Sequence, residues 1–361
     1  MSGDVQVGDR LGPYRLDRVV GEGSMGRVFL AVHLKLGRRV AIKMLRPEHA
    51  ANGTVVSRFF DEARAVNRIN HEHIIEIHDF VEDGPHCYCV MEHLDGMSLA
   101  DTAEAAPLPV QAIITVMQQL CSALGAAHEV GVVHRDVKPE NVILLRRPGA
   151  PLFVKVLDFG VAKLGADLRR TPVSQTAQGT LLGTPLFMAP EQIVGLEVDR
   201  RADVWAVGCL LYWLLAGRLP FNSPHFGQLS MQVIKEAPPP LPSRTPGGER
   251  VPAGLADLAL RCLAKSPEDR PSSMHEVRVA LDRPDAPWRR RLPEMARLKV
   301  AAIAAALLAA AAAWSYGWKE PAPAATAVDA VAQPKSQQEP QRARERVVPL
   351  DVDDTIDPFA R

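Results

Sequence analysis

The sequence has no excess charge of either sign, no apolar segment at its start and little cysteine. Lys plus Arg and Asp plus Glu number 42 each in 361 residues, so the composition does not favour a nucleic-acid partner. The five cysteines are scattered and odd in number, which favours reduced thiols over a disulfide framework. Residues 1–10 carry charges without an apolar core, so no secretory signal peptide is expected. The chain before residue 290 is therefore expected to stay in the cytoplasm.

Hydrophobic residues make up 47% of the chain, enough for the core of one large two-lobed domain or of two ordinary domains. A charge-free segment, 300–318, follows a basic stretch that includes Arg297 and Lys299. Its nineteen residues would span about 28 Å as a helix, close to the ~30 Å of a bilayer core. The segment is predicted to cross the membrane once. Ten of its residues are alanine, so a soluble Ala-rich helix is the alternative.

The stretch 134–141 reads His-Arg-Asp-Val-Lys-Pro-Glu-Asn, and an Asp-Phe-Gly step follows it at 158–160. A carboxylate, an ammonium and an amide so close in sequence must converge on one site. Phosphoryl transfer needs such a set, because it depends on positioning and on neutralising charge. Asp136 can accept the proton of an attacking hydroxyl, and Lys138 can lie on the γ-phosphate. Magnesium ligands can come from Asn141 and Asp158.

These residues resemble the catalytic loop and metal-binding motif of the eukaryotic-type protein kinases. The resemblance implies an α+β fold with two lobes, a small β-rich N-lobe over 14–94 and a larger α-helical C-lobe over 95–283. It also implies ATP and Mg²⁺ as cofactors and proteins as substrates. Lys138, two residues after the base, resembles the serine/threonine branch of the family. The Gly-Thr-Pro step at 183–185, before Met-Ala-Pro-Glu, indicates the same branch.

Three glycines, Gly21, Gly23 and Gly26, lie between apolar segments predicted as strands, 14–20 and 28–31. Glycines let a backbone approach a polyphosphate closely. Alone this pattern is shared with dinucleotide-binding folds, but those need a helix after the glycines, where this chain has a strand. The context is therefore that of a kinase glycine-rich loop.

Lys43 is the last residue of a predicted strand, 40–43. A lysine in a strand is usually a solvated charge at the edge of a sheet, so a functional role requires an anionic partner. Glu62 lies beside the apolar stripe of a helix predicted over 58–70. The pair matches the family's lysine to helix-C ion pair, which turns the lysine toward the α- and β-phosphates. The segment after it, 91–96, resembles the hinge between the lobes. The implied ATP-binding residues are Val20, Gly21, Gly23, Gly26, Val28, Ala41, Lys43, Glu62, Met91, Glu92, Leu94 and Ile143.

Arg135 stands beside the catalytic base, and hydroxyls follow in the segment after Asp158. Thr180 stands where family members carry an activating phosphate, with Thr176 as the next candidate. Thr184 resembles the family threonine held against the catalytic residues. A phosphate would bring about −1.5 to −2 charge and strong acceptor oxygens to the arginine. The resemblance therefore implies autophosphorylation, and a second copy of the chain is the expected partner for it in trans.

Two longer-range contacts are also implied by the resemblance. Asp203, in a nearly wholly apolar helix, matches the family aspartate that binds the catalytic-loop backbone, and Arg270 would pair with Glu191. The remaining domains are expected to be a basic linker at 284–299, the transmembrane helix at 300–318 and a disordered outer tail at 319–361. This organisation predicts a single-pass inner-membrane enzyme of bacterial type with its kinase domain in the cytoplasm.

Two other functions share parts of this pattern. A nucleotide-binding scaffold would not need the complete set of Lys43, Glu62, Asp136, Asn141 and Asp158. A transferase acting on a small molecule would not need the peptide-docking segment at 183–191. Incorporation of phosphate into protein or into a metabolite separates these interpretations.

Overall fold

The computed structural model describes residues 5–23, 26–84, 86–145, 149, 152–159 and 185–286. The chain divides into two compact units, Met1–Arg291 and Leu292–Arg361. All described residues belong to the first unit. The predicted linker beyond residue 286, the predicted transmembrane helix and the predicted tail lie outside the described residues.

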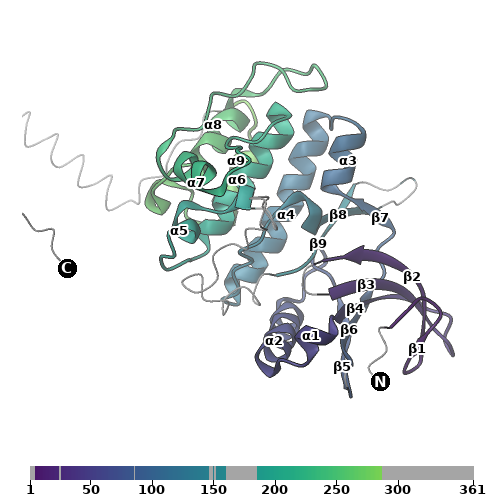
Figure 1. Cartoon of the computed structure of the whole chain (residues 1–361). Helices are drawn as coiled ribbons and strands as arrows, with labels where there is room; N and C mark the ends of the chain where they lie inside the picture. The colour runs from purple at the N-terminus through teal and green to yellow at the C-terminus, as the bar shows by residue number, and fades with distance from the viewer. Residues whose placement is uncertain are drawn as a thin grey trace, which may run out of the picture. The chain divides into compact units, whose positions relative to one another are not determined.

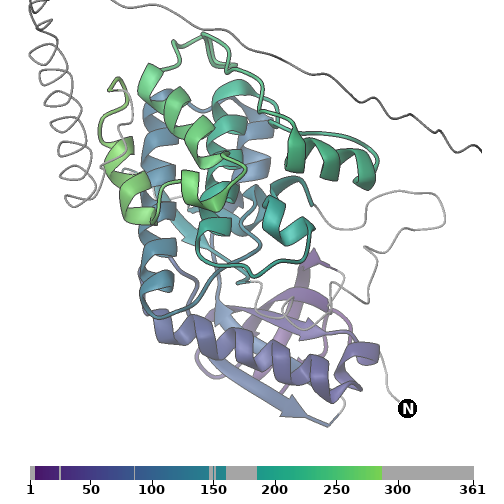
Figure 2. The same ribbon diagram turned by 90° about the vertical axis from the view of Figure 1, so that its left-hand side faces the viewer.

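A strongly curved antiparallel sheet builds the N-terminal lobe (Figure 1). Its strand order is β1-β2-β3-β4-β6-β5. Leu16, Phe29 and Ile42 are fully buried in a small core on one side of this sheet. Figure 2 shows α2 running along the sheet, where Phe59 packs with residues of β6. The bounds are β1 Arg10–Leu11, β2 Tyr14–Glu22, β3 Gly26–His33, β4 Arg39–Leu45, α1 Pro47–Ala50, α2 Gly53–Ile69, β5 Ile77–Asp83 and β6 His86–Glu92.

The larger lobe is helical, with a second, three-stranded sheet of order β7-β8-β9 on the side that faces the first lobe (Figure 1). Its core centres on α6, where only three of sixteen residues are not buried. Gly208 of α6 touches Cys262 of α8, and a Cβ atom there would meet the cysteine Cβ at 2.5 Å. The bounds are β7 Gly96–Ser98, α3 Leu99–Ala105, α4 Val110–Glu129, β8 Val142–Leu145, β9 Phe153–Val156, α5 Pro190–Ile193, α6 Arg201–Ala216, α7 Phe226–Lys235, α8 Ala253–Cys262 and α9 Met274–Leu281.

Several predicted bounds shift for local reasons. The helix predicted over 58–70 begins at Gly53, because the Asn52 side chain accepts hydrogen bonds from the N–H groups of Thr54 and Val55. The helix ends at Asn70, whose φ of 42° is left-handed. Val5 and Leu11, outside the predicted N-lobe, are buried against its sheet. The fold itself, a β-rich lobe beside a helical lobe, is as predicted.

Candidate active site

The loop that carries Asp136 is held by a buried carboxylate from α6. Asp203 is 1% exposed and accepts hydrogen bonds from the backbone N–H of His134 at 2.9 Å and of Arg135 at 2.8 Å. A third bond, 2.7 Å long, joins it to Nε2 of His128 in α4. A carboxylate is acceptable in a core only when it is paired in this way. The predicted contact of Asp203 with the backbone of this loop is confirmed. Its contact with His128 was not predicted from the sequence.

The His134 side chain ties the loop to the strand that leads to Asp158. Its Nε2 lies 2.9 Å from the carbonyl of Leu157, and its Nδ1 accepts from the N–H of Asp136 at 3.3 Å. One nitrogen donates and the other accepts, which fits a neutral imidazole. Burial lowers the pKa of His134 in spite of the nearby carboxylates, so the neutral form is favoured.

The predicted catalytic side chains converge. Lys138 Nζ lies 3.5 Å from Asp136 Oδ2. Asn141 is buried, and its Nδ2 donates to the carbonyl of Asp136 at 2.9 Å. Because the amide nitrogen of Asn141 makes this bond, its side-chain oxygen is the atom that can serve as a ligand, and a hard divalent cation prefers such oxygen ligands. A base, a cation and an amide therefore share one short loop.

Lys43 reaches across to this loop from β4. Its Nζ lies 2.6 Å from Asp158 Oδ1 and 3.9 Å from Glu62 Oε1, so the predicted partner is the more distant of the two carboxylates. Burial would lower the pKa of Lys43, but the two carboxylates outweigh it and the pKa is raised. Burial would likewise raise the pKa of Asp158, but the Lys43 ammonium outweighs it and the pKa is lowered. Both groups are thus charged at neutral pH.

Asp158 has a φ of 45°, which is rare for a residue with a side chain. Its side chain remains 49% exposed although Phe159, the next residue, is fully buried. Such a backbone persists only where the surrounding structure holds it, and outliers of this kind gather at functional sites. The Phe159 ring packs against the His134 ring with centroids 4.5 Å apart, which connects the two motifs.

The glycine-rich segment joins β2 to β3, with Gly21 paired to Val28. The Gly23 N–H donates to the Gly26 carbonyl at 2.9 Å. A Cβ atom at Gly26 would collide with the carbonyl oxygen of Met44, so this position cannot take a side chain without a shift. Arg46, which sequence reasoning missed, donates to the Gly23 carbonyl at 3.2 Å and pairs with Glu22 at 3.0 Å.

The apolar residues predicted around adenine lie on β2, β3, β4, β6 and β8 and just after β6. Ala41 and Met91 are paired across β4 and β6 and are buried. Val28 and Leu94 pack against the same core cluster. Val20, on β2, has 42% of its surface exposed. The remaining predicted position, Ile143, is half-buried on β8.

Glu92, in the segment predicted as the hinge, has partners that the sequence did not reveal. Its Oε1 accepts from Lys155 Nζ at 2.6 Å and from the N–H of Glu76 at 2.9 Å. Lys155 also donates to the carbonyl of Ile74 at 3.0 Å. Because Lys155 lies on β9, three residues before Asp158, this pair connects the hinge to the strand that leads to the predicted metal ligand.

A buried ion pair connects the start of α5 to the segment between α8 and α9. Arg270 Nη1 and Nη2 donate to Glu191 Oε1 and Oε2 at 2.6 and 2.8 Å. The other guanidinium N–H groups donate to the carbonyls of Ala264, Arg201 and Lys265 at 2.8, 3.0 and 3.1 Å. All five donors of the guanidinium are thereby used. The predicted pairing of Glu191 with Arg270 is confirmed.

The candidate phosphorylation sites Thr176 and Thr180, together with Thr184 and the end of the Asp-Phe-Gly step, lie outside the described residues. Their predicted roles therefore stay predictions. The neighbouring Arg135 is described. Its Nη2 lies 3.4 Å from the carbonyl of Val198, and its Nε is buried without a hydrogen-bond partner in the described part of the chain.

A family model described as the protein kinase domain matches residues 14–280, close to the predicted span of 14–283. The chain belongs to the protein kinase family. Pkn1 of Myxococcus xanthus, named a serine/threonine-protein kinase, is 46% identical over 278 residues. The match covers 77% of this chain and 39% of Pkn1. PknB of Mycobacterium tuberculosis, with the same description, is 37% identical over 285 residues, which cover 76% of this chain and 44% of PknB.

A crystal structure of the PknI kinase domain from Mycobacterium tuberculosis, in a double-mutant form, matches with a TM-score of 0.60 and 28% identity. It covers 79% of this chain and 100% of the crystallised domain. The kinase domain is thus of the serine/threonine type found in bacteria. The chain spans less than half the length of Pkn1 or PknB.

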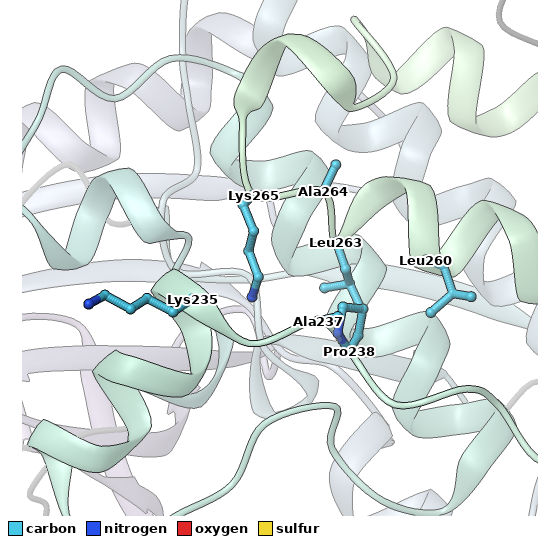
Figure 3. A pocket seen from close by; sticks show the side chains of 7 residues that line it. All are labelled: Lys235, Ala237, Pro238, Leu260, Leu263, Ala264 and Lys265. Atoms are coloured by element: carbon cyan, nitrogen blue, oxygen red, sulfur yellow. The ribbon is translucent and has the colours of Figure 1, made fainter.

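Two further features of the kinase domain bear on binding. A groove of about 400 Å³ lies between the end of α7 and α8 (Figure 3). Its Lys265 donates to the carbonyls of Gln232 and Val233 at 3.2 and 2.6 Å, and Lys235 extends away from the other lining side chains. Lys265 therefore caps the C-terminal end of α7 through these two hydrogen bonds.

The helix α4 is long and apolar enough to cross a membrane by length and composition alone. Nine of its residues, however, are buried in the helical lobe.

Proposed function

We propose that this kinase transfers the γ-phosphoryl group of ATP to serine or threonine hydroxyls of proteins. The observation that carries the proposal is the approach of Lys138 Nζ to within 3.5 Å of Asp136 Oδ2 on a loop held by the buried Asp203. Proton acceptance needs a carboxylate, and neutralisation of phosphate charge needs a cation. Both groups must lie close together and be fixed in position before the substrate arrives.

Each residue has a role in this proposal. Asp136 accepts the proton of the attacking hydroxyl, which makes the oxygen a better nucleophile. Lys138 balances negative charge on the phosphoryl group as it moves. Lys43 holds the α- and β-phosphates once ATP is bound, with Glu62 as the carboxylate that remains beside it. The glycine-rich segment, braced by Arg46 at Gly23, covers the phosphates.

The donor set near the phosphates fits magnesium. Asp158 supplies a carboxylate that is charged at neutral pH, and Asn141 supplies an amide, both of them oxygen ligands for a hard cation. When bound, magnesium would neutralise charge on the phosphate oxygens. Asn141 also keeps the Asp136 carbonyl in place, so its substitution would disturb the base as well as the metal.

Activation by autophosphorylation at Thr180, or next at Thr176, is part of the proposal. Its support is Arg135, a cation whose Nε is buried without a partner in the described residues and whose pKa is lowered by burial in spite of Asp203. A phosphate would supply the acceptor that this guanidinium lacks. Trans-phosphorylation would take place between two copies of the chain.

The proposal places the enzyme at the inner membrane through 300–318, with the kinase domain in the cytoplasm. The uncharged nineteen-residue segment and the basic stretch before it support this orientation. Protein substrates, ATP and the membrane are then its partners.

The test is the turnover of Asp136→Asn on a generic protein substrate with labelled ATP. Loss of a general base typically costs about 10² to 10⁴-fold, while nucleotide affinity should stay at the parental value. Asp17→Asn, at a half-buried carboxylate paired with Arg15 on β2, serves as the control and should be fully active. Parental turnover in Asp136→Asn, or labelling of a metabolite with no labelled protein, would disprove the proposed function.

A further inference from the structure

Side chains bind both polar groups of the peptide that joins Arg135 to Asp136. Arg135 has a φ of 64°, a left-handed conformation that costs energy for a residue with a Cβ atom. The N–H of this peptide, from Asp136, is bound by His134 Nδ1, and the Arg135 N–H, in the preceding peptide, is bound by Asp203. Because the peptide plane sets the direction in which the Asp136 side chain leaves the backbone, whatever fixes this plane also aims the base.

The carbonyl of this same peptide is bound from α5. Gln192 Nε2 donates to the Arg135 carbonyl oxygen at 3.0 Å. At its other end, Gln192 Oε1 accepts from the N–H of Ala189 at 2.9 Å. One amide side chain thus joins the residues just before α5 to the residue just before the base. The helix that carries it is itself fixed by the neighbouring ion pair of Glu191 and Arg270.

We propose that Gln192 is a positioning residue for phosphoryl transfer, which holds the peptide between Arg135 and Asp136 in the orientation that aims the carboxylate of Asp136. This inference rests on the proposed role of Asp136 as the base. Without the donor at 192, the Arg135 carbonyl loses its side-chain partner. The peptide then keeps the contact of its N–H with His134, and the Arg135 N–H, in the preceding peptide, keeps its contact with Asp203.

A simpler role for Gln192 is that of a helix cap. Its Oε1 satisfies the Ala189 N–H at the start of α5, as a Gln or Glu does in a capping box. The two roles use opposite ends of the amide, so they can be separated. Gln192→Glu keeps an acceptor for Ala189 and removes the donor to Arg135. Gln192→Met has a similar size, no charge and neither function.

The experiment measures kcat, KM for ATP, nucleotide affinity and Tm of the full-length protein and its variants. Because a misplacement of about 1 Å can cost about 10²-fold, the expected loss of kcat in Gln192→Glu is about 10- to 100-fold. Nucleotide affinity, KM for ATP and Tm should stay near the parental values. Gln192→Met should show the same loss of kcat with a lower Tm. Rates are expressed per nucleotide-binding site, so a smaller folded fraction does not count as lost turnover.

Gln118→Glu is the matched control, because Gln118 Nε2 also donates a hydrogen bond, to Asp282 at 2.7 Å, but from the middle of α4. It should keep parental kcat. Parental kcat in Gln192→Glu would show that Gln192 only caps α5 and would overturn the inference. A loss in Gln192→Glu with parental kcat in Gln192→Met would show an effect of the added charge and would overturn it as well. If Asp136→Asn is fully active, the proposed function fails instead.

Discussion

The ion pair between Glu191 and Arg270 offers the sharpest test of how the helical lobe is held together. Arg270→Met removes a side chain that is fully buried and keeps its approximate length. The Glu191 carboxylate, 7% exposed, would then face the interior with no cation. Breaking a buried pair by removing one partner typically costs about 3–5 kcal/mol, because the remaining charge is uncompensated. Three backbone carbonyls, of Ala264, Arg201 and Lys265, also lose a hydrogen bond from the guanidinium.

For a domain of this size, about 1 kcal/mol corresponds to about 2–4 °C in Tm, so Arg270→Met should melt about 6–20 °C below the parent. Thermal unfolding followed by circular dichroism and urea titration both measure the change. Glu268→Gln is the control, because the exposed pair of Glu268 with Arg201 contributes little to stability. The double variant with Glu191→Leu should regain part of the loss, because no isolated charge remains. The reasoning is refuted if Arg270→Met melts together with Glu268→Gln, or if the double variant melts below Arg270→Met.

Three further predictions concern the pH dependence of stability, the membrane and activation. Burial lowers the pKa of Lys265 to about 8, so between that pH and the ordinary value of 10.5 the unfolded chain binds more protons than the folded one. The free energy of unfolding should therefore increase as the pH rises through this window. Urea titrations should show this increase in the parent and not in Lys265→Met. Truncation before Val300 should move the protein from the membrane to the soluble fraction; a full-length protein found wholly in the soluble fraction contradicts the span. Thr180→Ala should lower activity, and peptide mapping of active protein should find phosphate on Thr180 or Thr176 that is absent from Asp136→Asn.

The close approach of the side chains in the loop 134–141 could be predicted from the sequence because these residues are close together in the chain. Asp136, Lys138 and Asn141 lie within six residues, so any fold that keeps this loop short brings them together. The pairing of Glu191 with Arg270, which are far apart in the chain, was predictable only through the family resemblance. The apolar pattern predicted strands at 14–20 and 40–43, and both lie within the observed strands β2 and β4.

The remaining contacts depend on tertiary distances that no pattern encodes. Lys43 lies nearer to Asp158 than to Glu62. The distance to Glu62 depends on the position of α2 beside the sheet, which the sequence pattern does not encode. His128 is a polar residue in an apolar helix, and only the fold shows that it faces Asp203. Gln192 has one sequence signal, its place three residues after Ala189 at the start of a helix, and that signal indicates a cap and nothing about the catalytic loop.

The contact between Lys43 and Asp158 has a consequence for the order in which ligands arrive. An ammonium already occupies one oxygen of the carboxylate that is proposed to bind the metal, so a free divalent ion must compete with a resident counterion. Bound nucleotide would remove that competition, because its phosphates would offer Lys43 another anion and so free the carboxylate. We therefore expect divalent cations to bind weakly to the protein alone and to enter together with ATP, one cation replacing another while the charge of the site stays balanced.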